Sequence, residues 1–145
     1  MSQLRKMALS GFVETAKDLN LATDEILYSH GLNANYFDRI GVDEMMDFEL
    51  AIGLIESVAK KSGEHHCAAL MGIKQDIHFL GIIGYLMEQS KDVFDALTAL
   101  SENLSIHTPT PVTIEDYGQL TGINFINILP LSRQSYSNEM AMAQA

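Results

Sequence analysis

The sequence is poor in basic residues, in cysteine and in long apolar runs, and it contains no tryptophan. It has 9 Lys and Arg residues against 19 Asp and Glu residues, which gives a formal net charge of −10. A protein surface that binds duplex DNA needs basic side chains to replace the counterions of the phosphates. The few basic residues of this chain are scattered along it. We therefore expect no direct binding of nucleic acid by this chain.

Two further shortages bear on where the protein works. The only cysteine, Cys67, cannot form an internal disulfide. No apolar run approaches the roughly 18 residues of a membrane-spanning helix, and the longest candidate, Phe79–Met87, contains two glycines. The N-terminus also lacks the apolar region of a secretory signal. These absences predict a cytoplasmic protein that does not enter a membrane.

The 145 residues are enough for one domain with a real core. Apolar side chains recur at helical spacing in several segments, some of which end at a glycine. The spacing predicts helices over residues 3–17, 23–30, 44–61, 65–72 and 91–104, with Thr23, Asp43 and Ser90 as capping residues. In the last of these helices, the side chains expected in the core are Val93, Leu97, Leu100 and Leu104.

After residue 105 the period of the apolar pattern changes. Val112 and Ile114 alternate with polar residues, 116–119 is a turn candidate, and 120–128 is strand-like. The alternation slips between Phe125 and Ile126, which indicates a bulge or a strand buried on both faces. The expected fold class is α+β, with a mostly helical N-terminal two-thirds packed on a small antiparallel sheet near residues 105–128. Residues 137–145 are helix-prone and have no stop signal.

The triplet His65-His66-Cys67 could suggest a metal site or a nucleophile. Adjacent side chains on a helix point about 100° apart, so the three do not converge on one ion. No base with an orienting third group accompanies Cys67 in the sequence. We favour ordinary capping or partly buried roles for these residues, and we expect no metal, no cofactor and no catalytic residue.

Polar residues inside apolar segments are the better candidates for a site. His78 precedes Phe79, Tyr85 lies within a run of apolar residues, and His107 lies on the short strand expected after the last core helix. Each could point a polar group into an apolar pocket, as in many small-ligand sites. The alternative for each is a buried side chain paired with the backbone. We expect the pocket between the helices and the 106–128 sheet.

Two segments, SGEHHCAALMG at 62–72 and LGIIGYLMEQSKDVFDALTAL at 80–100, carry a resemblance to a known family. Their order and spacing resemble the amino-terminal sensory domain of AraC-type transcriptional regulators, in the branch named for an arabinose-binding-like domain. The resemblance extends from about Leu4 to Arg133. Glu64 fits the acidic residue that family members commonly have after the glycine. The segment 91–94 departs from their usual Thr-Leu-Gly-like helix start.

The resemblance implies an effector-sensing and dimerisation domain over residues 1–135. Residues 136–145 would then begin a linker or helix toward a carboxy-terminal domain with two helix-turn-helix motifs, which this chain lacks. The implied partners are an unidentified small-molecule effector, a second copy of the chain, and DNA only through the missing domain. A dimerisation module without a ligand is the alternative, and a small enzyme is a further one.

Overall fold

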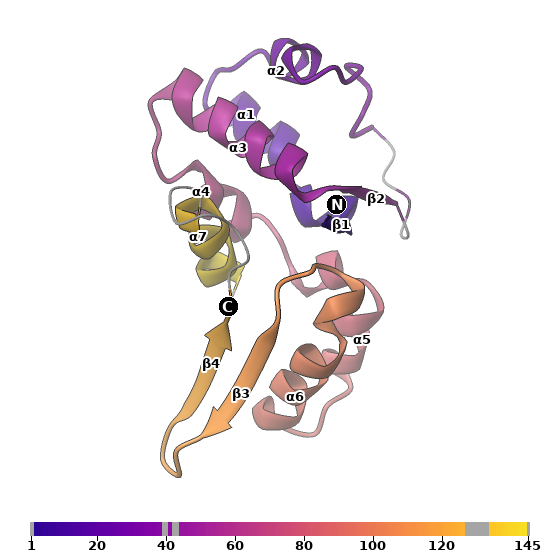
Figure 1. The fold of residues 1–145 in the computed structure, drawn as a ribbon, viewed down its shortest axis with the longest axis vertical. Coiled ribbons are helices and arrows are strands. Elements are labelled where there is room, and N and C mark those ends of the chain that lie inside the picture. The colour runs from indigo at the N-terminus through magenta and orange to yellow at the C-terminus, as the bar shows by residue number, and fades with distance from the viewer. Residues whose placement is uncertain (1, 39–40, 42–43, 127–133, 145) are drawn as a thin grey trace.

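The structure is a computed structural model, and it describes residues 2–38, 41, 44–126 and 134–144. These residues form an α+β fold of two lobes (Figure 1). The helical lobe consists of β1 (Gln3–Arg5), η1 (Lys6–Leu9), α1 (Phe12–Asp18), α2 (Thr23–Ser29), β2 (Met45–Asp47), α3 (Phe48–Ser62), α4 (Cys67–Ile73) and α7 (Gln134–Gln144). The hairpin lobe consists of η2 (Ile77–Leu80), α5 (Ile82–Glu88), α6 (Val93–Asn103), η3 (Leu104–Ile106), β3 (Val112–Asp116) and β4 (Thr121–Phe125).

The long helix α3 is the centre of the helical lobe. Its cap is Asp47, whose side chain accepts a hydrogen bond from the backbone N–H of Leu50 at 3.0 Å. The helix ends at Gly63, which adopts a left-handed conformation with φ 75°. The predicted start at Glu44 is wrong, because residues 45–47 pair with β1 as an antiparallel strand. Asp43, the expected cap, lies outside the described residues.

The beginning of the chain corrects a second prediction. Instead of one helix over residues 3–17, the chain forms strand β1, the short helix η1 and then α1. Gly11 separates the last two with φ 86°, a conformation that ends one helix before the next begins. Thr23 is also the first residue of α2 rather than its cap, because the capping position belongs to Ala22.

In the hairpin lobe, Asp92 rather than Ser90 caps α6. Its carboxylate accepts from the backbone N–H of Asp95 at 2.9 Å, whereas the Ser90 hydroxyl donates to the Leu86 carbonyl at the end of α5. The prediction that Val93 lies in the core is wrong, because its side chain is 75% exposed. At position 93 the helix has only begun, and no neighbouring element covers it. Leu104 is buried, as expected.

The β3–β4 hairpin confirms the predicted turn and most of the predicted strand. Val112 pairs with Phe125 and Ile114 with Ile123 in a regular antiparallel register, so residues 112–125 contain no bulge. Beyond β4, the backbone N–H of Ile126 donates to the Pro111 carbonyl at 3.0 Å, and residues 127 and 128 lie outside the described part. The hairpin packs on α5 and α6, and β1–β2 forms a second small sheet that the sequence analysis did not predict.

Helix α7 brings the chain back from the hairpin lobe to the helical lobe (Figure 1). It packs closely against α4 at Gly72: a Cβ atom added there would lie 2.8 Å from the Met140 carbonyl oxygen. The helical tail predicted for residues 137–145 is therefore observed, with an earlier start at Gln134. Whether residues 136–145 lead to a further domain stays a prediction.

Candidate functional site

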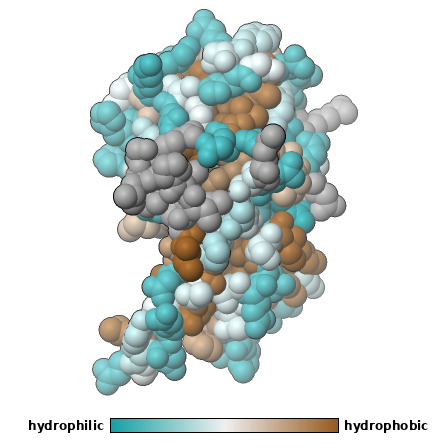
Figure 2. Space-filling model, in the orientation of Figure 1, coloured by the Kyte–Doolittle hydropathy of each residue, from teal (hydrophilic) through white to brown (hydrophobic). Residues whose placement is uncertain are grey.

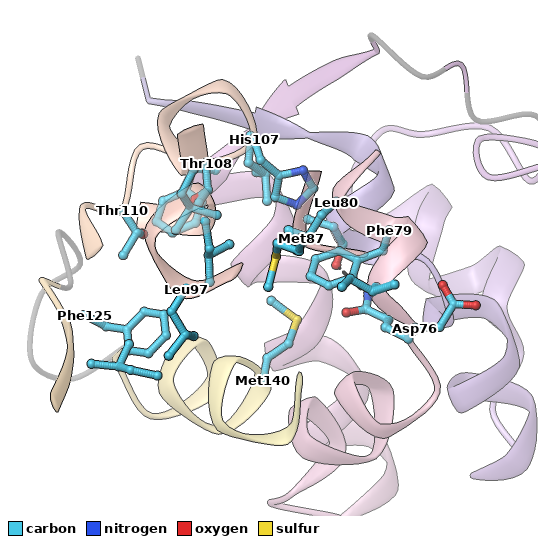
Figure 3. A pocket seen from close by; sticks show the side chains of 18 residues that line it. Asp76, Phe79, Leu80, Met87, Leu97, His107, Thr108, Thr110, Phe125 and Met140 are labelled. Carbon is cyan, nitrogen blue, oxygen red and sulfur yellow. Dashed lines mark hydrogen bonds between the residues drawn. The ribbon is translucent and has the colours of Figure 1, made fainter. Parts of the chain in front are cut away.

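A cavity of about 340 Å³ lies where the two lobes meet (Figure 3). One wall comes from β1, η1, α3 and α7, and the other comes from the hairpin lobe. Most of its lining is apolar: Leu4, Ala8, Phe48, Ile77, Phe79, Leu80, Met87, Leu97, Leu100, Leu104, Ile123, Phe125 and Met140. The cavity thus lies between the helices and the 106–128 segment, where the sequence analysis expected a pocket.

Two methionines meet inside this cavity. Met87 of α5 and Met140 of α7 point toward one another from opposite lobes (Figure 3). Methionine side chains are unbranched and adaptable, so they fill irregular space and adjust to a guest. The walls of the cavity can therefore change shape without moving the backbone.

His107 is the polar group buried in this apolar setting. Its backbone is fixed at the end of η3, because its N–H donates to the Leu104 carbonyl and its own carbonyl accepts from Arg5 N, both at 2.8 Å. Its side chain is 3% exposed and meets the Phe79 ring edge-on, with 5.2 Å between ring centroids. Within the described part of the chain, neither imidazole nitrogen has a hydrogen-bond partner. A buried polar atom left unpaired in this way costs roughly 1–3 kcal/mol.

The environment keeps this imidazole neutral. Burial lowers the pKa of His107 to about 4, and the positive charge of Arg5 acts in the same direction. At neutral pH the ring therefore carries one N–H donor and one bare nitrogen acceptor. Both nitrogens are shielded from solvent, so a guest molecule in the cavity reaches them only when neighbouring side chains shift.

The other polar lining residues lie nearer the edges of the cavity. Gln75 donates through its side-chain nitrogen to the carbonyls of Ala8 (2.8 Å) and Ser10 (2.7 Å), which ties the connection between the lobes to η1. Asp76 accepts from the backbone N–H of His78 at 2.9 Å. Thr108 and Thr110 add hydroxyl groups on the His107 side.

His78 and Tyr85 do not line the cavity, so the expectation that they point into an apolar pocket is wrong. The His78 side chain is 74% exposed, with Nδ1 3.2 Å from an Asp76 carboxylate oxygen. Tyr85 is 58% exposed on α5. Gly81, whose positive φ of 60° suits glycine, forms the turn that leads into α5. Of the three predicted site residues, the structure places His107 alone in the cavity.

Sequence reasoning missed the lining residues of the other lobe. Phe48 and Met140 are far from His107 in the sequence and carry no local signal of a site. Thr108 and Thr110 did carry a local signal of a site, because they alternate with prolines directly after His107. That pattern marks an extended segment whose hydroxyl groups can face the same side as a neighbouring site.

The His65-His66-Cys67 triplet is separate from the cavity. Cys67 is buried, and its Sγ donates to the Ile55 carbonyl at 3.6 Å. Burial, together with the negative charge of Glu139, raises the pKa of this thiol to about 11, so it stays protonated and a poor nucleophile at neutral pH. Among the described residues, no three His, Cys, Asp or Glu side chains converge as a metal site would require.

No protein-family model and no curated protein matches this chain. Within the part of the chain that the structure describes, every helix is too short or too polar to span a bilayer.

Proposed function

We propose that this chain is the ligand-sensing and dimerisation domain of an AraC-type transcriptional regulator, and that its effector binds between the lobes. The single observation that carries the proposal is the apolar cavity of about 340 Å³ containing the buried, unpaired His107. Small-molecule sites are concave, mostly apolar and equipped with a few polar groups, and they occur preferentially where two parts of a protein meet. The resemblance of segments 62–72 and 80–100 to the sensory domains supplies the regulatory context.

The size of the cavity limits the effector. An apolar cavity of about 150 Å³ holds one benzene molecule. A cavity of about 340 Å³ therefore suits a molecule about twice that size. Such a molecule touches both lobes at once.

Contact with both lobes is what makes the site suited to sensing. Hydrogen bonds that join the lobes among the described residues include those from the backbone and Nε of Arg5 to the carbonyls of His107 and Ile106, and those from Gln75 to the carbonyls of Ala8 and Ser10. A ligand shifts the equilibrium between two arrangements of the lobes only by the difference in its affinity for those two arrangements. Met140 extends the contact to α7, so a change in the cavity reaches that helix directly.

The remaining partners follow from the same proposal. With a net charge of −10, the domain leaves DNA binding to a helix-turn-helix domain that would follow it in the full regulator. Regulators of this type bind repeated DNA sites, so a homodimer is the proposed assembly. The cytoplasm is the proposed location.

A thermal-shift screen with small metabolites tests the proposal. Ligand binding to the folded state raises Tm in proportion to the logarithm of ligand concentration over Kd. Leu97 points into the cavity, so Leu97→Trp should fill it and abolish the shift. Val93→Trp places the same side chain on the same helix at an exposed position and should keep the shift. If no compound stabilises wild type more than Leu97→Trp, the sensing proposal is wrong.

A dimerisation module without a ligand is the second candidate, because apolar side chains are exposed on the hairpin lobe (Figure 2). Among them are Ile82, Tyr85 and Leu86 on α5, and Val93 and Phe94 on α6. Exposed apolar surface marks a protein–protein contact where it is contiguous. A dimer in sedimentation experiments, together with no stabilising metabolite, would favour this candidate.

A further inference from the structure

We infer that the effector is an uncharged, largely apolar molecule that carries a hydroxyl or carbonyl group, and that this group hydrogen-bonds to His107. The inference rests on the proposed function, because it assumes that the cavity binds a small molecule. It goes further by naming the chemical class of that molecule and the residue that selects it.

The position of His107 is the first step. Its ring lies beside Phe79 and Met87 (Figure 3), and only 3% of the residue is exposed. Neither nitrogen is accessible to solvent or has a hydrogen-bond partner among the described residues. Buried polar groups in proteins are nearly always paired, so two unpaired nitrogens in a cavity wall indicate a partner that occupies the cavity.

The absence of a counter-charge is the second step. No Lys or Arg lines the cavity in the part of the chain that the structure describes. The Nζ of the nearby Lys6 forms an ion pair with a carboxylate oxygen of Glu44 at 2.8 Å. The Nε of Arg5 donates a hydrogen bond to the Ile106 carbonyl of η3. An anionic ligand would lose its hydration at a neutral imidazole, and Arg5, whose charge acts on His107, lies outside the cavity lining and already donates to Ile106, so no lining cation offsets that loss.

A cationic ligand is disfavoured for a different reason. Asp76 is the one carboxylate among the described lining residues, and its side chain is 77% exposed. It already accepts from the backbone and the ring of His78. A cation beside it would sit in solvent, where an exposed ion pair contributes little. The buried end of the cavity therefore suits a neutral group.

The hydrogen-bonding capacity of a neutral imidazole completes the match. Its N–H donates and its bare nitrogen accepts, so a hydroxyl group can use either nitrogen and a carbonyl oxygen can use the N–H. Thr108 and Thr110, which follow His107 along the chain, add hydroxyl groups to the lining of the cavity. The rest of the lining is mostly apolar and suits an apolar ligand body.

Three probes of matched shape test the inference: 4-propylphenol, propylbenzene and 4-propylbenzoate. Binding of each to the wild-type chain is measured by titration calorimetry at pH 7. We expect 4-propylphenol to bind about tenfold more tightly than propylbenzene, because only the phenol satisfies His107. We expect 4-propylbenzoate to bind more weakly than either.

Variants assign the preference to His107. His107→Leu should reduce the preference for the phenol to within about twofold, and His107→Asn, which keeps a donor and an acceptor, should restore part of it. His78→Leu removes an exposed histidine outside the cavity and should leave the preference unchanged. The Asn variant keeps the test meaningful if the Leu variant folds poorly.

The outcomes separate this inference from the proposed function. Equal binding of phenol and propylbenzene, tightest binding of the benzoate, or an unchanged preference in both His107 variants overturns the inference. The inference is also wrong if none of the three probes binds while a charged metabolite stabilises the wild type but not Leu97→Trp. In that case the sensing proposal still stands. If no probe or metabolite distinguishes wild type from Leu97→Trp, both are wrong.

Discussion

The helical lobe and the hairpin lobe bury their apolar side chains in different ways. In the helical lobe, side chains such as Ile26, Leu27 and Leu54 are fully buried in one continuous cluster. The cluster of the hairpin lobe has four buried side chains among the described residues, which are Leu80, Ile83, Leu104 and Val112. Much of its remaining apolar surface faces the cavity. The stability of the hairpin lobe therefore depends on what occupies the space between the lobes.

A comparison of α3 with α6 shows that this difference does not lie in the helices themselves. Each begins after a capping aspartate, Asp47 or Asp92, and each has apolar residues at helical spacing. Yet α3 buries side chains along its whole length, whereas no side chain of α6 is fully buried. Amphipathicity decides which face of a helix turns inward. How completely that face is covered is decided by the neighbouring elements.

The largest expected effect comes from truncating a core leucine in each lobe. Leu54→Ala should lower the free energy of unfolding by about 2–5 kcal/mol, because it leaves a cavity in a closed core. Leu97→Ala should cost only about 1 kcal/mol, because the Leu97 side chain is half-buried and already borders empty space. Urea denaturation measures both values. Equal losses would show that the two lobes are packed to the same degree.

Acid should destabilise the protein through His107. The pKa of this histidine is about 4 in the folded state and about 6.5 in the unfolded state. Between these values the unfolded chain binds more protons, so stability falls as the pH is lowered from 6.5 toward 4. The contribution of His107 should decrease by about 2 kcal/mol between pH 7 and pH 5.

Comparison with a variant isolates this contribution from that of the carboxylates. The difference in unfolding free energy between His107→Leu and wild type should grow in favour of the variant as the pH falls from 7 to 5. His78→Leu is the matched control for the loss of a histidine at an exposed position. A difference for His107→Leu that stays constant with pH would mean that its ring is hydrated in solution.

The sequence predicted the parts of the fold that depend on local signals. Periodic apolar residues and a glycine at position 63 located most of α3, and the turn at 116–119 located the hairpin. The β1–β2 sheet was missed because each strand has only three residues and its partner lies far along the chain. Pairing of that kind leaves no periodic trace in either segment.

The candidate site was predictable only in part for a related reason. One signal, a polar residue within an apolar segment, selected His78, Tyr85 and His107 alike. The signal identifies a polar group but not the direction in which it points, which depends on tertiary contacts. His107 is turned inward because its backbone is tied to Arg5 of the other lobe. The lining residue Met140 depends on the docking of α7, which no local pattern shows.

Undocking α7 should produce an intermediate effect. Gly72→Ala would place a Cβ atom 2.8 Å from the Met140 carbonyl oxygen and 2.9 Å from the Ala143 side chain. Overpacking against a helix backbone should cost about 1–3 kcal/mol and speed hydrogen exchange throughout α7. Hydrogen-exchange mass spectrometry follows that helix directly.

The matched control for this change is Gly53→Ala in α3. There the new Cβ would meet only the edge of the His30 ring, at 3.1 Å, which is a side chain and not a helix backbone. The gain in helix propensity of about 1 kcal/mol offsets the contact. If Gly72→Ala leaves exchange in α7 unchanged, then α7 does not need this close approach, and its contact with the cavity through Met140 is looser than the structure indicates.

The smallest expected effect compares the two capping aspartates. Asp47 and Asp92 accept nearly identical hydrogen bonds, at 3.0 Å and 2.9 Å, at the starts of α3 and α6. Replacing either with alanine removes about 1 kcal/mol from its helix. Asp47→Ala should lower global stability by that amount, because α3 opens only when the whole core does. Asp92→Ala should instead speed exchange in α6 by about fivefold with little change in global stability, because α6 opens locally. Equal losses of global stability in both variants would contradict the contrast, since they would show that the two lobes unfold as one cooperative unit.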